Sequence, residues 1–164
     1  MNTAYLLLGG NEGDTTLYLQ SAYGLISASC GAIIQYSPVY QTAAWGLQEQ
    51  PDFLNQVIAI HTTLSPFILL EKIQDIEKEL GRQRTIKWGQ RTLDIDILLY
   101  DDVVIDTPLL TIPHPSTPMR RFTLAPLAAI APAYVHPVLK KTIQELLDEC
   151  PDPLPTLRLD INLH

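Results

Sequence analysis

The chain has few cysteines, few basic residues and no long hydrophobic run. Its 164 residues include only Cys30 and Cys150, which have neither metal-ligand spacing nor the density of a disulfide scaffold. No apolar stretch approaches the roughly 20 residues that a membrane span needs. Residues 1–5 also lack the basic segment of a signal peptide. We therefore expect a cytoplasmic protein without a membrane partner, in which both cysteines are reduced and buried.

Positive charge is scarce overall and concentrated in one segment. The chain has 11 Lys and Arg against 18 Asp and Glu, and a formal net charge of -7. Arg82, Arg84, Lys87 and Arg91 nevertheless lie close together in the sequence, beside Trp88. A basic cluster on an acidic chain favours a small anionic ligand, since nucleic acid favours a broad positive surface. The plain alternative is a solubilising charged loop.

The hydrophobic pattern predicts the order strand, helix, strand, strand, helix, strand. Asp14 is the expected N-cap of the first helix, which stops near Gly31, and Ser65 with Pro66 begins the second, which stops at Gly81. This order is the split βαβ pattern of an α+β, ferredoxin-like antiparallel sheet with helices packed on one face. The expected strands cover residues 4–8, 32–41, 53–62 and 92–100.

The remaining residues read as C-terminal additions to that core. Pro126 is expected to start a short helix that runs to Ala131, and Thr142 with Glu145 has the signature of a capping box. Residues 157–163 alternate apolar and polar side chains, which fits a late edge strand. The length suits one core, so residues 1–164 are expected to form a single domain.

Two aspartates follow the basic segment. On a strand, Asp94 and Asp96 leave the same face about 7 Å apart, given a rise of about 3.3 Å per residue. Like charges on one face repel and Asp is a poor strand former, so a divalent cation is the natural compensation. A solvated strand face is the alternative.

Residues 53–55 pair an aromatic ring with an amide. Phe53 and Asn55 share one face of their strand, and this combination suits a flat heterocycle. The alternative is a core Phe beside a satisfied Asn. In the same way, His114 fits a structural loop and Phe122 a core position. No Lys-Ser or Lys-Thr follows Gly9 and Gly10, so the Walker pattern is absent.

Three separated stretches give the chain a family resemblance. Residues 91–100, Arg-Thr-Leu-Asp-Ile-Asp-Ile-Leu-Leu-Tyr, resemble the signature of the 6-hydroxymethyl-7,8-dihydropterin pyrophosphokinase family. Residues 50–55 and 112–114, followed by Arg120 and Phe122, support it in order and spacing. The resemblance extends to about residue 137.

The resemblance implies an enzyme of folate biosynthesis. Such an enzyme transfers the diphosphate of ATP to the hydroxymethyl group of 6-hydroxymethyl-7,8-dihydropterin and releases AMP. The competing hypothesis is a non-catalytic, small-molecule-binding regulatory domain of ferredoxin-like fold, which would form no AMP. A nucleic-acid binder of RRM type needs adjacent aromatics and a basic surface, and the chain has little of either. We expect a monomer.

The resemblance also assigns roles to individual positions. Asp94 and Asp96 would hold two Mg²⁺ ions, and together with Arg82, Arg84 and Arg91 they would be the catalytic residues. The pterin pocket would consist of Thr42, Ala43, Trp45, Phe53, Asn55 and Phe122. The nucleotide side would consist of Gln74, Glu77, Arg82, Arg84, Trp88, Arg91, Thr111, His114 and Arg120.

Overall fold

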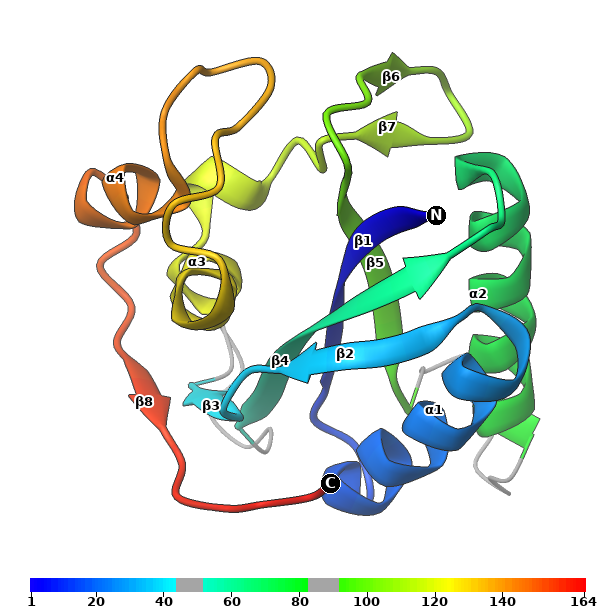
Figure 1. The fold of residues 1–164 in the computed structure, drawn as a ribbon. Coiled ribbons are helices and arrows are strands. Elements are labelled where there is room, and N and C mark those ends of the chain that lie inside the picture. Colours follow the sequence, from blue (N-terminus) through cyan, green and yellow to red (C-terminus); the bar gives the residue numbers. More distant parts are fainter. Residues whose placement is uncertain (44–51, 83–91) are drawn as a thin grey trace.

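A computed structural model describes residues 1–43, 52–82 and 92–164, apart from the side chain of Arg82. Within these ranges the central sheet has the order β5-β1-β4-β3-β8, and β2 pairs with β4 beside β3 (Figure 1). Every pairing in this sheet is antiparallel. Its strands are β1 (Asn2–Gly10), β2 (Ala32–Tyr36), β3 (Tyr40–Thr42), β4 (Phe53–Thr62), β5 (Asp94–Tyr100) and β8 (Thr156–Arg158).

Two long helices cover one face of the sheet. They are α1 (Thr15–Ser29) and α2 (Pro66–Arg82), which lie side by side (Figure 1). Asp14 caps α1 as expected, since its carboxylate accepts a hydrogen bond from the Leu17 amide at 3.2 Å. The first helix ends before Gly31, also as expected. The expected α+β, ferredoxin-like sheet is confirmed.

β1, β4 and β5 each contribute side chains to two separate apolar clusters. In β1, Leu6 and Leu8 pack toward α1 and α2, whereas Leu7 points to the opposite face. There it meets Val57 of β4 and Leu124 of α3 (Arg121–Ile130). The pocket described below lies on the same face of the sheet as Leu7, which lines it.

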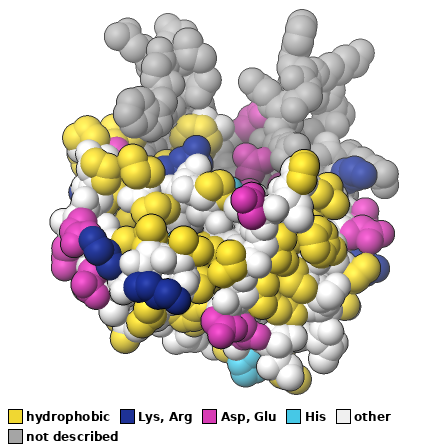
Figure 2. Space-filling view, turned by 90° about the horizontal axis from the view of Figure 1, so that it is seen from above, with side chains coloured by type: hydrophobic (Ala, Val, Ile, Leu, Met, Phe, Trp, Pro, Cys, Tyr) yellow, Lys and Arg dark blue, Asp and Glu magenta, His cyan; other side chains and the backbone are white. Residues whose placement is uncertain are grey.

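The C-terminal additions pack on both sides of the sheet. Besides α3, they include η1 (Thr117–Met119), α4 (Ile143–Asp148) and a hairpin of β6 (Ile105–Asp106) and β7 (Thr111–Ile112). Hydrophobic side chains cover much of the end of the molecule seen in Figure 2, with charged groups scattered among them. None of the described helices is both long and apolar enough to cross a membrane.

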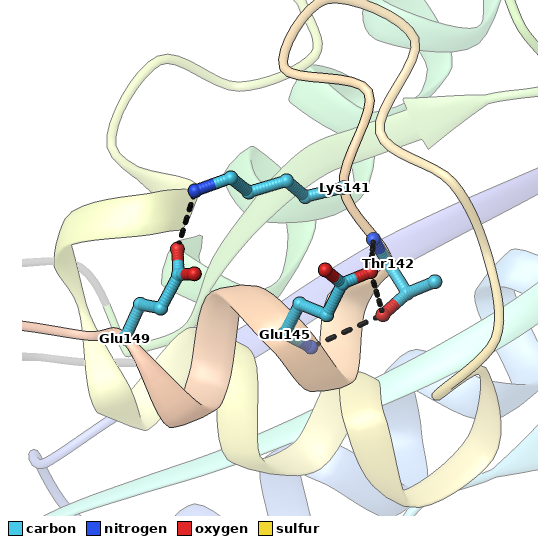
Figure 3. A network of polar contacts seen from close by, with 4 residues as sticks. All are labelled: Lys141, Thr142, Glu145 and Glu149. Carbon is cyan, nitrogen blue, oxygen red and sulfur yellow. Dashed lines mark hydrogen bonds and ion pairs between the residues drawn. The ribbon is translucent and has the colours of Figure 1, made fainter.

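The expected capping box at Thr142 is confirmed. The Thr142 hydroxyl accepts a hydrogen bond from the Glu145 amide at 3.1 Å, and the Glu145 carboxylate accepts one from the Thr142 amide, also at 3.1 Å (Figure 3). Lys141, just before the cap, forms an ion pair at 2.6 Å with Glu149 at the other end of the helix. The short helix α4 thus begins where its local sequence specifies.

The expected strand over residues 32–41 is wrong in its continuity. It is broken into β2 and β3 by Ser37, Pro38 and Val39. The Ser37 amide donates to the Val57 carbonyl and its hydroxyl accepts from the Val57 amide, at 2.8 and 2.9 Å. Gln56 donates to the Ser37 carbonyl at 2.9 Å. These buried bonds satisfy the chain where the ladder is interrupted.

Two helix boundaries, the end at Gly81 and the start at Pro126, are wrong. Gly81 does not stop α2, because it lacks the positive φ of a left-handed cap, and the helix runs on to Arg82. Pro126 lies inside α3 instead of at its start, since that helix begins at Arg121. Proline there lacks the amide that would bond to the Phe122 carbonyl.

Three smaller expectations need correction. β1 continues through Gly9 and Gly10, which were expected to form a turn after residue 8. The late edge strand exists but is limited to β8, with Leu157 exposed. Cys30 is buried as expected, whereas Cys150 is only partly buried; both are free thiols.

Candidate active site

A pocket of about 920 Å³ lies on the sheet face that α3 partly covers. Strand pairing explains its floor. Gly9 is paired with Asn55 on one side and with Asp94 on the other, while Leu7 is paired with Asp96. Directly opposed residues of antiparallel strands leave the same face. The neighbouring strands β5, β1 and β4 therefore bring an amide and two carboxylates to one surface.

Gly9 is required by the position of Asn55. A Cβ at residue 9 would lie 2.2 Å from Asn55 Oδ1, closer than carbon and oxygen approach. The missing side chain makes room for the amide, which is buried at 5% exposure and lines the pocket. Gly9 was not identified as a site residue from the sequence, because its contact with Asn55 exists only after β1 and β4 pair.

Two phenylalanines contribute the aromatic part of the pocket. Phe53 begins β4 and Phe122 lies in the first turn of α3; both are half-buried and line the cavity. The Arg120 guanidinium lies over the Phe122 ring, 5.6 Å from its centroid. Arg120 also lines the cavity, which places one cation beside the aromatic surface.

Thr42 and Ala43 form the rim at the end of β3. The Thr42 hydroxyl is buried and has no hydrogen-bond partner within the described part of the chain. A buried hydroxyl without a partner is costly unless a ligand or water bonds to it. Thr42 itself lines the pocket.

Asp94 and Asp96 provide the negative part of the pocket. Asp94 is exposed and Asp96 half-buried, with Ile95 buried between them, as alternation along a strand requires. Among the described residues no group of three or more His, Cys, Asp and Glu is placed to hold a metal. Two carboxylates still fit Mg²⁺, which takes one or two from the protein and fills its remaining positions with water and phosphate oxygens.

Glu77 braces the strand that carries these carboxylates. Its Oε2 accepts a hydrogen bond from the Ile95 amide at 2.9 Å, which ties α2 to β5 between the two aspartates. The resemblance implied a nucleotide contact for Glu77. The structure gives its side chain a contact with the protein, and Glu77 does not line the described pocket.

His114 adjoins the site without lining it. Its amide donates to the Leu98 carbonyl at 3.0 Å, and its Nδ1 accepts from the Ser116 amide at 3.2 Å. Burial lowers the pKa of His114, nearby Asp96 acts in the opposite direction, and Arg120 lowers it further. The next two residues, Pro115 and Ser116, do line the pocket.

The predicted residues fall into three groups. Those that line the pocket are Thr42, Ala43, Phe53, Asn55, Asp94, Asp96, Arg120 and Phe122. Those described elsewhere are Gln74, which is exposed on α2, Glu77, Thr111 on β7 and His114. Trp45, Arg84, Trp88 and Arg91 lie outside the described residues. Arg82 was expected in a loop and is instead the last residue of α2.

Sequence reasoning missed about half of the lining. Leu7 and Gly9 belong to β1, and Met119 lies in η1 just before Arg120. Leu7 and Gly9 are two residues apart, so they share one face of β1. This spacing could have identified them, had the strand been expected to extend to Gly10. Pro151, Asp152 and Pro153 also line the pocket, and no sequence signal indicated them.

Comparison with known proteins gives consistent similarities. Residues 5–132 match the model of the 7,8-dihydro-6-hydroxymethylpterin-pyrophosphokinase (HPPK) family. The 2-amino-4-hydroxy-6-hydroxymethyldihydropteridine pyrophosphokinase of Aquifex aeolicus is 44% identical over 149 residues, which cover 91% of this chain and 92% of that protein. The Bacillus subtilis protein of the same name is 45% identical over 130 residues, which cover 79% and 78%.

Longer proteins also contain a similar part. The folic acid synthesis protein fol1 of Schizosaccharomyces pombe is 42% identical over 149 residues, 90% of this chain but 20% of that protein. The crystal structure of wild-type Plasmodium falciparum HPPK-DHPS matches with a TM-score of 0.75 at 20% identity, over 90% of this chain and 44% of that one. At such identity the structural match shows the fold alone, and this chain spans less than half of that protein's length.

Proposed function

Since the chain belongs to the 7,8-dihydro-6-hydroxymethylpterin-pyrophosphokinase family, we propose that the pocket on the α3 side of the sheet is its active site. The chain is an ATP-dependent diphosphokinase of folate biosynthesis, with ATP as co-substrate and hydroxymethyldihydropterin as acceptor. One observation supports the proposed location most. A single cavity combines two phenylalanines and an amide with two carboxylates and an arginine.

The aromatic end suits the pterin. Phe53 and Phe122 would stack on the faces of its ring, since flat heterocycles bind well between aromatic side chains. The Asn55 amide has both a donor and an acceptor and would bond to the ring edge. The unpartnered Thr42 hydroxyl would supply a further hydrogen bond. Trp45, which lies outside the described residues, is proposed to belong to the same pocket.

The carboxylate end suits metal and phosphate. Asp94 and Asp96 would hold Mg²⁺, and we propose two ions because the substrate has several phosphate oxygens to bridge. Bound there, Mg²⁺ would neutralise phosphate charge. Glu77 would keep both carboxylates in place through the Ile95 amide.

Arginines would stabilise the charge of the transferring group. Arg120 lines the cavity, and Arg82, Arg84 and Arg91 are proposed to act with it as catalytic residues. Gln74, Trp88, Thr111 and His114 are proposed to contact the nucleotide. Such a transfer depends mainly on alignment and on charge stabilisation.

The proposed reaction is an in-line displacement. The hydroxymethyl oxygen of the pterin attacks the β-phosphorus of ATP, the bond from that phosphorus to the α-phosphate oxygen breaks, and AMP leaves. The hydroxyl proton is released. No covalent intermediate with the protein is needed, and no described residue has to act as a nucleophile.

The test is AMP formation from ATP, Mg²⁺ and 6-hydroxymethyl-7,8-dihydropterin. Asp96→Ala should abolish it while the thermal midpoint stays close to that of the native chain. Asp106→Ala is the matched control, because it removes an equal charge from an exposed position on β6. Near-normal activity of Asp96→Ala would remove this carboxylate from the mechanism. Substrate binding without AMP would favour the regulatory-domain hypothesis.

A further inference from the structure

One wall of the pocket comes from a part of the chain that the family match does not reach. Residues 151–153, here called the wall segment, all line the cavity. The family model ends at residue 132. The wall segment lies on the same cavity as Phe122 and Arg120, which the family resemblance assigns to substrate contacts.

The wall segment is held by Arg121. This side chain donates from Nε to the Asp152 carbonyl at 3.2 Å and from Nη2 to the Cys150 carbonyl at 3.3 Å. In return, the Arg121 amide donates to Asp152 Oδ2 at 3.2 Å. Three bonds therefore join one residue of α3 to Cys150 and Asp152, on either side of Pro151.

Asp152 is also fixed from its other oxygen. Its Oδ1 accepts from the Leu154 amide at 3.0 Å, and the residue is only 9% exposed. A nearly buried carboxylate is costly without hydrogen-bond partners, and here both oxygens accept one. The side chain is therefore held in a single position. The wall segment consequently has a defined conformation and position.

The residues that follow pair with the strand that carries Thr42. β8 pairs with β3, with Thr156 directly opposite Thr42 and Arg158 opposite Tyr40. The Thr156 hydroxyl, like that of Thr42, is buried without a hydrogen-bond partner in the described ranges. β8 therefore covers the outer edge of the short strand that presents Thr42 to the cavity (Figure 1).

We propose that the wall segment forms part of the pterin-binding surface and contributes to pterin affinity. Arg121 is the positioning residue that holds the segment there. Arg121 lies between Arg120 and Phe122, so a single turn of α3 presents two pocket side chains and anchors the wall beside them. Arg121 does not line the cavity itself. The inference rests on the proposed placement of the pterin in this pocket.

The experiment compares the affinities of two ligands. Binding of α,β-methylene ATP with Mg²⁺ is titrated first, and 6-hydroxymethyl-7,8-dihydropterin is then titrated into the saturated complex. Arg121→Ala should raise the pterin Kd about tenfold, as expected when one or two hydrogen bonds that order a binding surface are lost. The Kd of the nucleotide analogue should stay within about twofold. Arg121→Lys, which keeps a cationic donor, should recover part of the pterin affinity.

Two further variants make the test decisive. Asp152→Asn should weaken pterin binding in the same direction and by less, which keeps the test open if Arg121→Ala does not fold. Arg158→Ala is the matched control, because it removes an exposed arginine from β8 outside this pocket and should leave both affinities unchanged.

Phe53→Ala separates this inference from the proposed function. If Phe53→Ala weakens pterin binding and the Arg121 and Asp152 variants do not, the wall has no role and the inference is overturned. If Phe53→Ala also has no effect, the placement of the pterin is wrong. Equal weakening of both ligands by Arg121→Ala, with a large fall in thermal midpoint, would show a general structural role and also overturn it.

Discussion

Residue 9 must be glycine because the Asn55 side chain occupies the space that a larger residue would need. Gly9→Ala would place a methyl group 2.2 Å from Asn55 Oδ1, so the amide must move. We expect pterin binding to weaken by about 1 kcal/mol, the net value of one hydrogen bond. Isothermal titration would measure it.

Gly24→Ala is the control for this substitution. Gly24 lies in α1, and an added Cβ there would meet nothing within 4 Å. Alanine should stabilise that helix by about 0.5 to 1 kcal/mol and leave binding unchanged. If Gly9→Ala bound the pterin as well as Gly24→Ala does, the position of the Asn55 amide would not matter for recognition.

Phe53 tests the aromatic end of the site. Phe53→Ala should weaken pterin binding by about 1 to 3 kcal/mol, the range for bases that stack on aromatic side chains. Nucleotide affinity should hardly change. Phe67→Ala, on the exposed surface of α2, controls for the loss of a phenylalanine. Equal weakening of both ligands would make Phe53 a core residue.

Among single residues, those predicted correctly to line the pocket without the family resemblance belong to pairs of functional side chains only two positions apart in the sequence. Asp94 with Asp96 and Phe53 with Asn55 stood out in this way, and all four line the pocket. Gly9 and Asp152 did not, because the role of each depends on a residue far away in the chain. These residues are Asn55 for Gly9 and Arg121 for Asp152. The nucleotide contact of Glu77 stays a prediction, and one of its carboxylate oxygens bonds to the Ile95 amide.

Among the secondary-structure elements, α4 depends most clearly on local sequence. Thr142→Ala removes the hydroxyl that accepts from the Glu145 amide, and should lower the free energy of unfolding by about 1 kcal/mol. Chemical denaturation would measure the loss. Activity at saturating substrate should not change, because α4 does not line the pocket.

Glu149→Gln is the comparison for that cap. It breaks the ion pair with Lys141 shown in Figure 3, but both side chains are about half exposed. Exposed pairs contribute little, so the loss should be smaller than that from Thr142→Ala. The reverse order would mean that the ion pair, and not the cap, holds this helix.

The elements that the sequence predicted well are those with local signals. Asp14, Ser65 with Pro66, and Thr142 mark helix starts through short-range bonds, and β4 agrees with its expected range. The break between β2 and β3 depends instead on Gln56 and Tyr23, whose hydroxyl donates to the Gln56 amide oxygen. Burial raises the pKa of Tyr23 to about 12, so this hydroxyl remains a donor.

For the whole molecule, two histidines predict sensitivity to acid. Burial lowers the pKa of His136 and of His114 below 6.5. His136 Nδ1 accepts from the Val138 and Leu139 amides at 3.2 and 3.0 Å, which requires the unprotonated nitrogen. The unfolded chain therefore takes up these protons first as the pH falls.

The free energy of unfolding should consequently decrease as the pH falls below about 6.5, until the folded-state pKa values are passed. Each histidine contributes at most about 1.4 kcal/mol per pH unit. Urea unfolding between pH 7.5 and 5 would measure the slope. His136→Gln should reduce it. An unchanged slope in His136→Gln would exclude this residue as a source.

Three expectations about the whole molecule stay predictions. They are a monomeric state, a cytoplasmic location and a single domain over residues 1–164. Sedimentation velocity would test the first, and the broad apolar surface in Figure 2 makes that measurement informative. Oligomeric state depends on partners, location depends on the cellular compartment, and domain number depends on cooperative folding. The hydrophobic pattern of the sequence does not determine any of these.

The position of the wall segment also sets an order of events during synthesis. Residues 151–153 leave the ribosome after every other described residue that lines the pocket. A nascent chain that has not reached them already has Phe53, Asn55 and Asp96 but lacks the surface that faces them. Ligands stabilise only the form that binds them. A pterin bound against this wall therefore stabilises the chain fully only once residues 151–153 are in place, and the growing chain folds up to that point without the full stabilisation.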